Sequence, residues 1–181
     1  MAHEVQEVFA GRQWHFCFMG GLAVQRWGEP RLTQDIDVTL LTGFGAEESY
    51  IDTLLMLYPG RRPDAKSFAL QYRVLLLRSS RGIGVDIALG ALPFEETCIK
   101  RATYFEFLPK ISLLTCSAED LIVMKAFADR DIDWHDVKGI IMRQQTRLNW
   151  DYIHEQLTPL CELKENPAII THLKQLREMT S

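Results

Sequence analysis

The sequence predicts an α+β protein, with a mixed α/β portion up to about residue 116 and a helical C-terminal portion after it. Short apolar runs separated by glycine-containing turns dominate the first part, whereas from Ser117 onward the apolar residues recur at helical spacing. Helices gathered at one end of the chain are typical of the α+β class. We therefore expect a core over residues 1–116 and a helical portion over residues 117–181 packed on it, or one single domain containing both.

The composition is that of an ordinary globular protein, because 47% of the 181 residues are hydrophobic, 24% are charged and the formal net charge is −4. This mild charge argues against a general nucleic-acid coat, although it is compatible with a local basic patch. The four cysteines are widely spaced, so we expect buried reduced thiols rather than a zinc site. The start of the chain lacks a leader pattern and no apolar run approaches the ~20 residues that span a bilayer, so we expect a cytoplasmic protein without a membrane partner.

Hydrophobic periodicity and turn residues set the individual elements. Those expected before residue 60 are a helix over the first dozen residues, a strand over 16–19, a helix over 22–27, a strand over 31–41 and a helix over 47–58. The next expected elements are a hairpin of strands 72–77 and 84–89, a short helix or turn over 94–101, and strands over 103–107 and 111–115. Four helices complete the chain, over 121–129, 133–145, 149–161 and 167–178, and Ser117 with Asp120 resembles a capping box at the start of the first.

Three aspartates, Asp35, Asp37 and Asp86, are embedded in apolar runs that read Asp-Ile-Asp-Val and Val-Asp-Ile-Ala. Residues two apart in a strand share a face, so Asp35 and Asp37 point the same way. Acids in such runs are costly to bury without a compensating charge, and three convergent carboxylates suit a hard cation such as Mg²⁺ carrying phosphates. A solvated strand face is the alternative explanation for each of them.

A glycine pair, Gly20-Gly21, lies between the expected strand 16–19 and the expected helix 22–27. Two glycines there let backbone N–H groups approach an anion at the helix N-terminus, although such pairs often only make a turn. The order of the glycine pair, the two acids on one strand and the third acid resembles the nucleotidyltransferase superfamily related to DNA polymerase β. The resemblance implies a nucleotidyltransferase-like mixed β-sheet with flanking helices, an NTP substrate, and two Mg²⁺ ions held by the catalytic residues Asp35, Asp37 and Asp86.

Further motifs resemble the AbiEii-type toxin branch of that superfamily. They are the Arg-Leu-Thr-Gln segment at 31–34, the helical segment 119–125 and the segment 130–136. The resemblance implies that Arg31, Thr33 and Lys125 bind nucleotide phosphates together with Gly20 and Gly21. It also implies transfer of an NMP to a hydroxyl acceptor, which we leave open between RNA such as tRNA, a small molecule and a protein, and an antitoxin protein as a partner.

The residues of the helical portion allow simpler explanations as well. Lys125 falls on the apolar stripe of its helix, so it either snorkels past the helix end or points toward phosphates. Asp133 and Asp136 either support Lys125 or Arg31 by ion pairing or cap the next helix. The basic residues between 61 and 81 are a solvated face or an RNA contact.

Two alternatives to nucleotidyl transfer stay open at this point. Leu22 follows the glycine pair, where many members of the superfamily have a hydroxyl residue, and this favours a non-catalytic nucleotide-binding or regulatory module. Hydrolysis of phosphoesters by the same carboxylates is the other alternative. The three embedded acids favour the enzyme over the regulatory module.

Overall fold

The computed structural model describes residues 1–180, which divide into two compact units. Unit 1 comprises Met1–Leu22 and Leu32–Cys116, and unit 2 comprises Ala23–Arg31 and the residues from Ser117 onward. The strand-rich and helical portions of the sequence therefore fall in different units, and the segment Ala23–Arg31 belongs with the helical one. The α+β class predicted from the sequence is confirmed.

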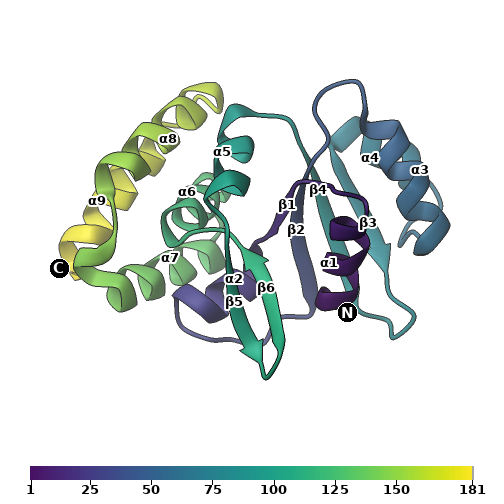
Figure 1. Cartoon of the computed structure of the whole chain (residues 1–181). Helices are drawn as coiled ribbons and strands as arrows, with labels where there is room; N and C mark the ends of the chain where they lie inside the picture. The colour runs from purple at the N-terminus through teal and green to yellow at the C-terminus, as the bar shows by residue number, and fades with distance from the viewer. Residues whose placement is uncertain (181) are drawn as a thin grey trace. The chain divides into compact units, whose positions relative to one another are not determined.

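Unit 1 is built on a six-stranded mixed sheet with the strand order β3-β4-β2-β1-β6-β5 (Figure 1). The strands are β1 (Phe16–Phe18), β2 (Asp35–Leu41), β3 (Val74–Arg78), β4 (Gly84–Gly90), β5 (Thr103–Leu108) and β6 (Ile111–Thr115). The pairs β2–β4 and β1–β6 are parallel, whereas β1–β2, β3–β4 and β5–β6 are antiparallel. The expected hairpin β3–β4 is confirmed, and the two strands expected after it, β5 and β6, also pair as an antiparallel hairpin.

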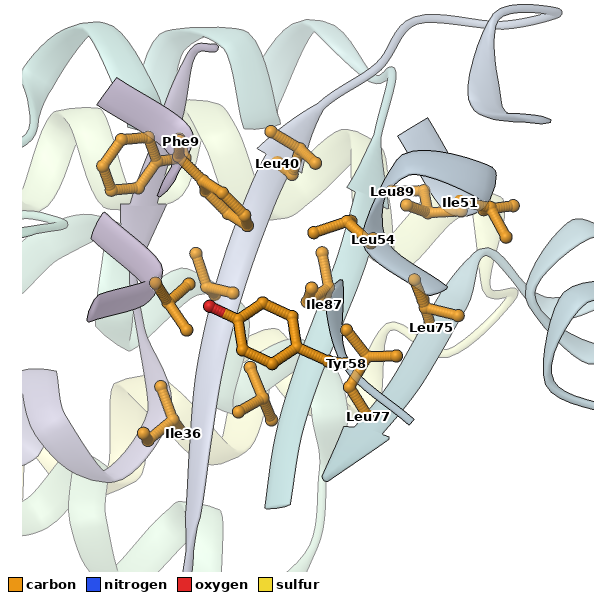
Figure 2. Packing of buried hydrophobic residues seen from close by; sticks show 14 of the residues in the cluster. Phe9, Ile36, Leu40, Ile51, Leu54, Tyr58, Leu75, Leu77, Ile87 and Leu89 are labelled. Atoms are coloured by element: carbon orange, nitrogen blue, oxygen red, sulfur yellow. The ribbon is translucent and has the colours of Figure 1, made fainter. Parts of the chain in front are cut away.

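One face of this sheet carries the hydrophobic core of unit 1. It is covered by helices α1 (Ala2–Gly11), α3 (Glu47–Leu57) and α4 (Ala65–Tyr72). Figure 2 shows Phe9 of α1 and Ile51 and Leu54 of α3 packed near the strand residues Leu40 and Ile87. These five side chains are at most 1% exposed, and burying each one contributes roughly 1.5–3 kcal/mol. This core fixes the register of the strands that carry the acids.

The opposite face of the sheet is polar at one end and covered at the other. Helix α5 (Pro93–Arg101) lies against its covered end, where Cys98 Sγ is 3.8 Å from Cys17 Sγ of β1. All four cysteines are free and buried, as the sequence predicted. Thr39 of β2 lies on this face and is 1% exposed, whereas Asp35 and Asp37 on the same face are partly exposed.

Unit 2 consists of helices. They are α6 (Ala118–Ala128), α7 (Asp131–Gln144), the 3₁₀ turn η1 (Gln145–Arg147), α8 (Trp150–Leu163) and α9 (Ala168–Thr180), together with the segment Ala23–Arg31 that continues helix α2 (Gly20–Trp27). Ser117 caps α6, because its Oγ accepts a hydrogen bond from the Asp120 backbone N–H at 3.1 Å. Among residues 1–180, no helix is both long enough and apolar enough to cross a membrane.

Two local predictions differ from the structure. Helix α4 was not predicted, because its buried residues are only Ala65 and Ala69, which give no strong apolar stripe. The strand predicted over 31–41 begins at Asp35 instead. The preceding residues are held differently, since Thr33 Oγ1 donates to the Asp35 backbone oxygen at 3.0 Å.

Candidate functional site

The carboxylate row of β2 has the geometry that its sequence predicts. Ile36 and Val38 are 7% and 2% exposed and point into the core, while Asp35 and Asp37 alternate with them and are partly exposed on the opposite face. The strand therefore buries its apolar residues and presents two carboxylates side by side. This arrangement follows from the period of two residues in a strand.

The third carboxylate, Asp86, joins the same row. Parallel pairing of β2 with β4 places Asp86 directly opposite Asp37, and it places Gly84 opposite Asp35. Residues opposite each other on neighbouring strands have side chains on the same face. Two strands that are far apart in the sequence thus bring Asp35, Asp37 and Asp86 together within unit 1.

An arginine that sequence reasoning did not single out bridges two of these acids. Arg61 Nη2 donates to Asp86 Oδ1, and Arg61 Nη1 lies 3.6 Å from Asp35 Oδ1. From the sequence, Arg61 belongs to a basic stretch that was assigned to a solvated face or an RNA contact. Its true position depends on the register of three strands, and no local pattern in the sequence reveals it.

Other cations of that basic stretch form ion pairs within unit 1 instead of one continuous patch. Arg62 pairs with Asp64, and Lys66 lies 2.7 Å from both Glu48 and Asp52. The side chain of Arg61 is 21% exposed, compared with 45% for Arg62 and 40% for Lys66. Arg61 is therefore the enclosed member of these three, and it is the one that contacts the carboxylate row.

The electrostatic setting raises the pKa of Asp86 to about 6. Burial is the largest cause, and the neighbouring carboxylates of Asp37 and Asp35 raise the pKa further. The Arg61 guanidinium acts in the opposite direction and limits the rise. A carboxyl group with this pKa can accept and release a proton near neutral pH, as a general base requires.

The glycine pair leaves room for two site residues. Gly20 has a left-handed backbone with φ of +53°, and a Cβ there would overlap the Asp37 carboxylate. A Cβ at Gly21 would lie 2.5 Å from Oγ1 of Thr33. Helix α2 begins at Gly20, so the Asp37 carboxylate lies beside the first residue of this helix. The glycine pair is therefore required for the close approach of Asp37 and Thr33 to the start of the helix, in addition to any role in turning the chain.

The carboxylate oxygens of this row are suitable ligands for a divalent cation, but in the structure an arginine lies against two of them. Carboxylate oxygens are the ligands that Mg²⁺ prefers, and Gly20 and Gly84 keep the space beside the Asp37 and Asp35 carboxylates free of side-chain carbon. Within residues 1–180, however, no group of three or more His, Cys, Asp or Glu side chains has a metal-holding arrangement. The Arg61 guanidinium supplies the positive charge to Asp35 and Asp86 instead.

The remaining predicted site residues form a separate charge network inside unit 2. Lys125 Nζ lies 2.9 Å from Asp133 Oδ1 and 2.7 Å from Asp136 Oδ2. Arg31 binds Asp136 with two parallel hydrogen bonds of 2.8 and 2.9 Å, and Arg130 Nε donates to Asp133 at 2.5 Å. Of the two roles left open for the aspartates, the structure shows the ion pairing with both Lys125 and Arg31.

Burial and pairing act on these two aspartates in opposite directions. Asp133 and Asp136 are 1% and 2% exposed, and this burial alone would raise the pKa of each carboxyl. Hydrogen bonds and charges from Arg130 and Lys125 at Asp133, and from Arg31 and Lys125 at Asp136, outweigh it and lower both pKa values. The two carboxylates are therefore held in their charged form.

The simpler explanations for Lys125 and Asp133 do not describe their contacts. The Lys125 side chain is 8% exposed, so it stays inside unit 2 and does not snorkel into solvent. The N-cap of α7 is Arg130, and Asp133 is the third residue of the helix. Its carboxylate binds Lys125 and Arg130 instead of capping the helix.

Comparison with solved structures places the fold in a known class. The chain matches an antigenic nucleotidyltransferase-like protein from Paracoccidioides brasiliensis with a TM-score of 0.54 and 16% identity, over 96% of this chain and 90% of that one. It also matches the lincosamide antibiotic adenylyltransferase LnuA, bound to lincomycin, with a TM-score of 0.50 and 12% identity, over 76% of this chain and 92% of that one. The fold of this chain is nucleotidyltransferase-like. At these identities the likeness concerns the fold alone, and no family model and no curated protein matches the sequence.

Proposed function

We propose that this protein is a metal-dependent nucleotidyltransferase that moves an NMP from an NTP to a hydroxyl acceptor. The observation that carries the proposal is the convergence of Asp35, Asp37 and Asp86 on one face of the sheet, next to the glycine pair that opens α2. The nucleotidyltransferase-like fold supports it.

Each residue of the row has a role in this reaction. Asp35, Asp37 and Asp86 would hold Mg²⁺, which when bound neutralises the triphosphate and lowers the pKa of the attacking hydroxyl. Asp86, which lies opposite Asp37 in this row, is the proposed acceptor of the proton of that hydroxyl. The hydroxyl oxygen then bonds to the α-phosphorus, the bond from the α-phosphorus to the bridging oxygen breaks, and pyrophosphate leaves.

Phosphate recognition is assigned to the residues around the glycine pair. The N–H groups at the start of α2 and the Thr33 hydroxyl are the proposed contacts within unit 1, and their support is the close approach of Gly20 and Gly21 to Asp37 and Thr33. Phosphate binding by Arg31 stays a prediction, since in the structure its guanidinium binds Asp136. The same holds for Lys125, which is buried against Asp133 and Asp136 within unit 2.

The acceptor class is the finer part of the proposal. The fold similarity to an adenylyltransferase bound to lincomycin favours a small hydroxylated molecule. The AbiEii-type resemblance of segments 31–34 and 119–136 favours the 3′ end of a tRNA, with an antitoxin as protein partner. A hydroxyl group of a protein is the third acceptor class that we consider.

Label transfer tests the proposed activity. The purified protein is incubated with α-³²P-labelled NTPs and Mg²⁺, in separate reactions with tRNA, total protein, and lincosamides and aminoglycosides. We expect label in one acceptor pool and a loss of at least 1,000-fold in the Asp35→Asn/Asp37→Asn variant, since no carboxylate pair then remains on β2. Asp52→Asn, an exposed aspartate outside the site, is the matched control. Transfer that survives the double change would contradict the assignment.

A second candidate function is supported by the Arg61 bridge. A guanidinium placed between two of the three acids occupies the position of a metal ion, as a non-catalytic nucleotide-binding module would allow. For that function, calorimetry would show NTP binding that is independent of Mg²⁺, and no acceptor pool would take up label. NTP binding that requires Mg²⁺ would favour the enzyme.

A further inference from the structure

The backbone of Arg61 is fixed to the edge of the sheet. Arg61 N–H donates to Leu76 O at 2.9 Å, Arg78 N–H donates to Pro59 O at 2.9 Å, and Gly60 forms a bridge with Leu77. These contacts place Arg61 opposite Leu76 of β3, and Leu76 is opposite Asp86 in the next pair of strands. The side chain of Arg61 therefore leaves the backbone on the same face of the sheet as Asp86.

The side chain reaches the acids through a gap that only glycine provides. Gly84 stands opposite Asp35, next to Asp86 on β4, and a Cβ there would overlap Asp35 Oδ1 and lie 2.8 Å from Arg61 Nη1. Its φ is not in the left-handed region, so space rather than backbone conformation requires the glycine. The chain thus holds a slot in which a guanidinium fits between two carboxylates.

The bridge is incomplete as a hydrogen-bonded structure. Arg61 hydrogen-bonds to Asp86, but its approach to Asp35 at 3.6 Å is too long for a hydrogen bond. Its Nε atom is buried and has no hydrogen-bond partner among the described residues. By contrast, Arg31 makes two hydrogen bonds of normal length to Asp136. The guanidinium of Arg61 is therefore held by its hydrogen bond to Asp86 and by the charge of Asp35, with one of its N–H groups unused within residues 1–180.

We propose that Arg61 is a resident counter-cation of the carboxylate row, which holds Asp35 and Asp86 in the metal-free protein and is displaced when a divalent cation binds there. The inference rests on the proposed function only for the place of the cation, not for the transfer reaction. Arg61 is a positioning residue in this account. The presence of Arg61 weakens metal binding in the absence of nucleotide. The site is therefore loaded with metal only when the nucleotide and the cation arrive together.

Metal binding to the nucleotide-free protein tests this directly. Mn²⁺ affinity is measured by electron paramagnetic resonance titration for the wild type, Arg61→Gln and the control Arg62→Gln, whose side chain pairs with Asp64 instead. We expect Arg61→Gln to bind Mn²⁺ at least tenfold more tightly than the wild type and Arg62→Gln to match the wild type. Without metal, Arg61→Gln should melt at a lower temperature, and Mn²⁺ should restore the loss. A folded Arg61→Gln that binds Mn²⁺ no more tightly than the wild type overturns the proposal.

A measurement on the unmodified protein covers the case in which Arg61→Gln does not fold. Phenylglyoxal modifies exposed guanidinium groups, and peptide mass spectrometry separates modification of Arg61 from that of Arg62. We expect Mn²⁺ to raise the modification rate of Arg61 severalfold and to leave that of Arg62 unchanged. An unchanged or lower rate at Arg61 shows that the bridge is permanent and refutes displacement. Neither readout needs label transfer, so an inactive protein with a displaceable Arg61 would contradict the proposed function alone.

Discussion

The two charge clusters of this protein contain the same kinds of groups but use them differently. In unit 2, Asp133 and Asp136 are almost fully buried, and Lys125, Arg31 and Arg130 supply more positive than negative charge. In unit 1, two partly exposed carboxylates, Asp35 and Asp86, share the guanidinium of Arg61. Charges that are buried and fully paired hold a structure together. An exposed cluster with excess charge of one sign is ready to take up a ligand of the opposite sign.

The pKa values express the same contrast. Pairing lowers those of Asp133 and Asp136 in spite of burial, whereas burial and neighbouring acids raise that of Asp86 in spite of Arg61. The surroundings of Asp133 and Asp136 stabilise the charged carboxylate form of both side chains. The third acid is destabilised as a carboxylate, and strongly perturbed groups of this kind are typical of functional sites.

The largest effect is expected from removing the central cation of the buried cluster. Lys125→Met leaves two buried carboxylates without their shared partner, so we expect the free energy of unfolding to fall by about 3–5 kcal/mol. Urea unfolding followed by tryptophan fluorescence measures this, because Trp27, Trp134 and Trp150 lie in unit 2. Lys138→Met, at an exposed position of α7, is the matched control and should change stability by less than about 0.5 kcal/mol. A loss of unfolding free energy below about 1 kcal/mol for Lys125→Met would contradict a stabilising role of this buried cluster.

A smaller loss is expected from filling the slot in unit 1. Gly84→Ala forces Asp35 and Arg61 apart, and we expect about 1–2 kcal/mol, at the lower end of overpacking costs because both are side-chain ends that can move. Hydrogen exchange of β4 peptides, read by mass spectrometry, reports the change. Gly11→Ala has no atom within 4 Å of the added methyl group and should leave exchange in unit 1 unaltered. Equal behaviour of the two variants would show that the slot is not tight.

The smallest effect is expected from pH, and it has opposite signs in the two clusters. The lowered pKa values of Asp133 and Asp136 contribute stability that is present above the ordinary value of 3.8 and is lost as the pH falls below it. The raised pKa of Asp86 contributes stability at low pH that is lost as the pH rises from 3.8 through about 6. For Asp86, whose side chain is partly exposed, we expect about 1 kcal/mol or less after solvent screening. Unfolding curves from pH 3 to 8 should lose the upper dependence in Asp86→Asn and show a weaker lower dependence in Asp133→Asn, where Asp136 remains. The reverse pattern would contradict the assignment.

The acidic row was predictable from the sequence because its cause is local. Strand residues alternate between faces, so apolar Ile36 and Val38 place Asp35 and Asp37 together whatever surrounds them. The third acid followed from the same reasoning once β4 paired with β2. The ion pairing of Asp133 and Asp136 with Lys125 was also among the expected alternatives.

Arg61 was not predictable because its cause is not local. Its contact with Asp86 requires residues 59–61 to align with β3, β3 to align with β4, and a glycine at position 84. Helix α4 was missed for a different reason, since two alanines bury too little apolar surface to mark a helical stripe. Arg61 was therefore missed because its contacts depend on the register of distant strands, and α4 was missed because its buried residues are small.

Gly84 also constrains how this site can change during evolution. Any larger residue at position 84 occupies the space in which the Arg61 guanidinium meets Asp35. A Cβ at position 84 would overlap Asp35 Oδ1 and lie 2.8 Å from Arg61 Nη1, so the loss of Arg61 alone does not free this position. The residues at positions 35, 61 and 84 are therefore constrained together, although they are far apart in the sequence.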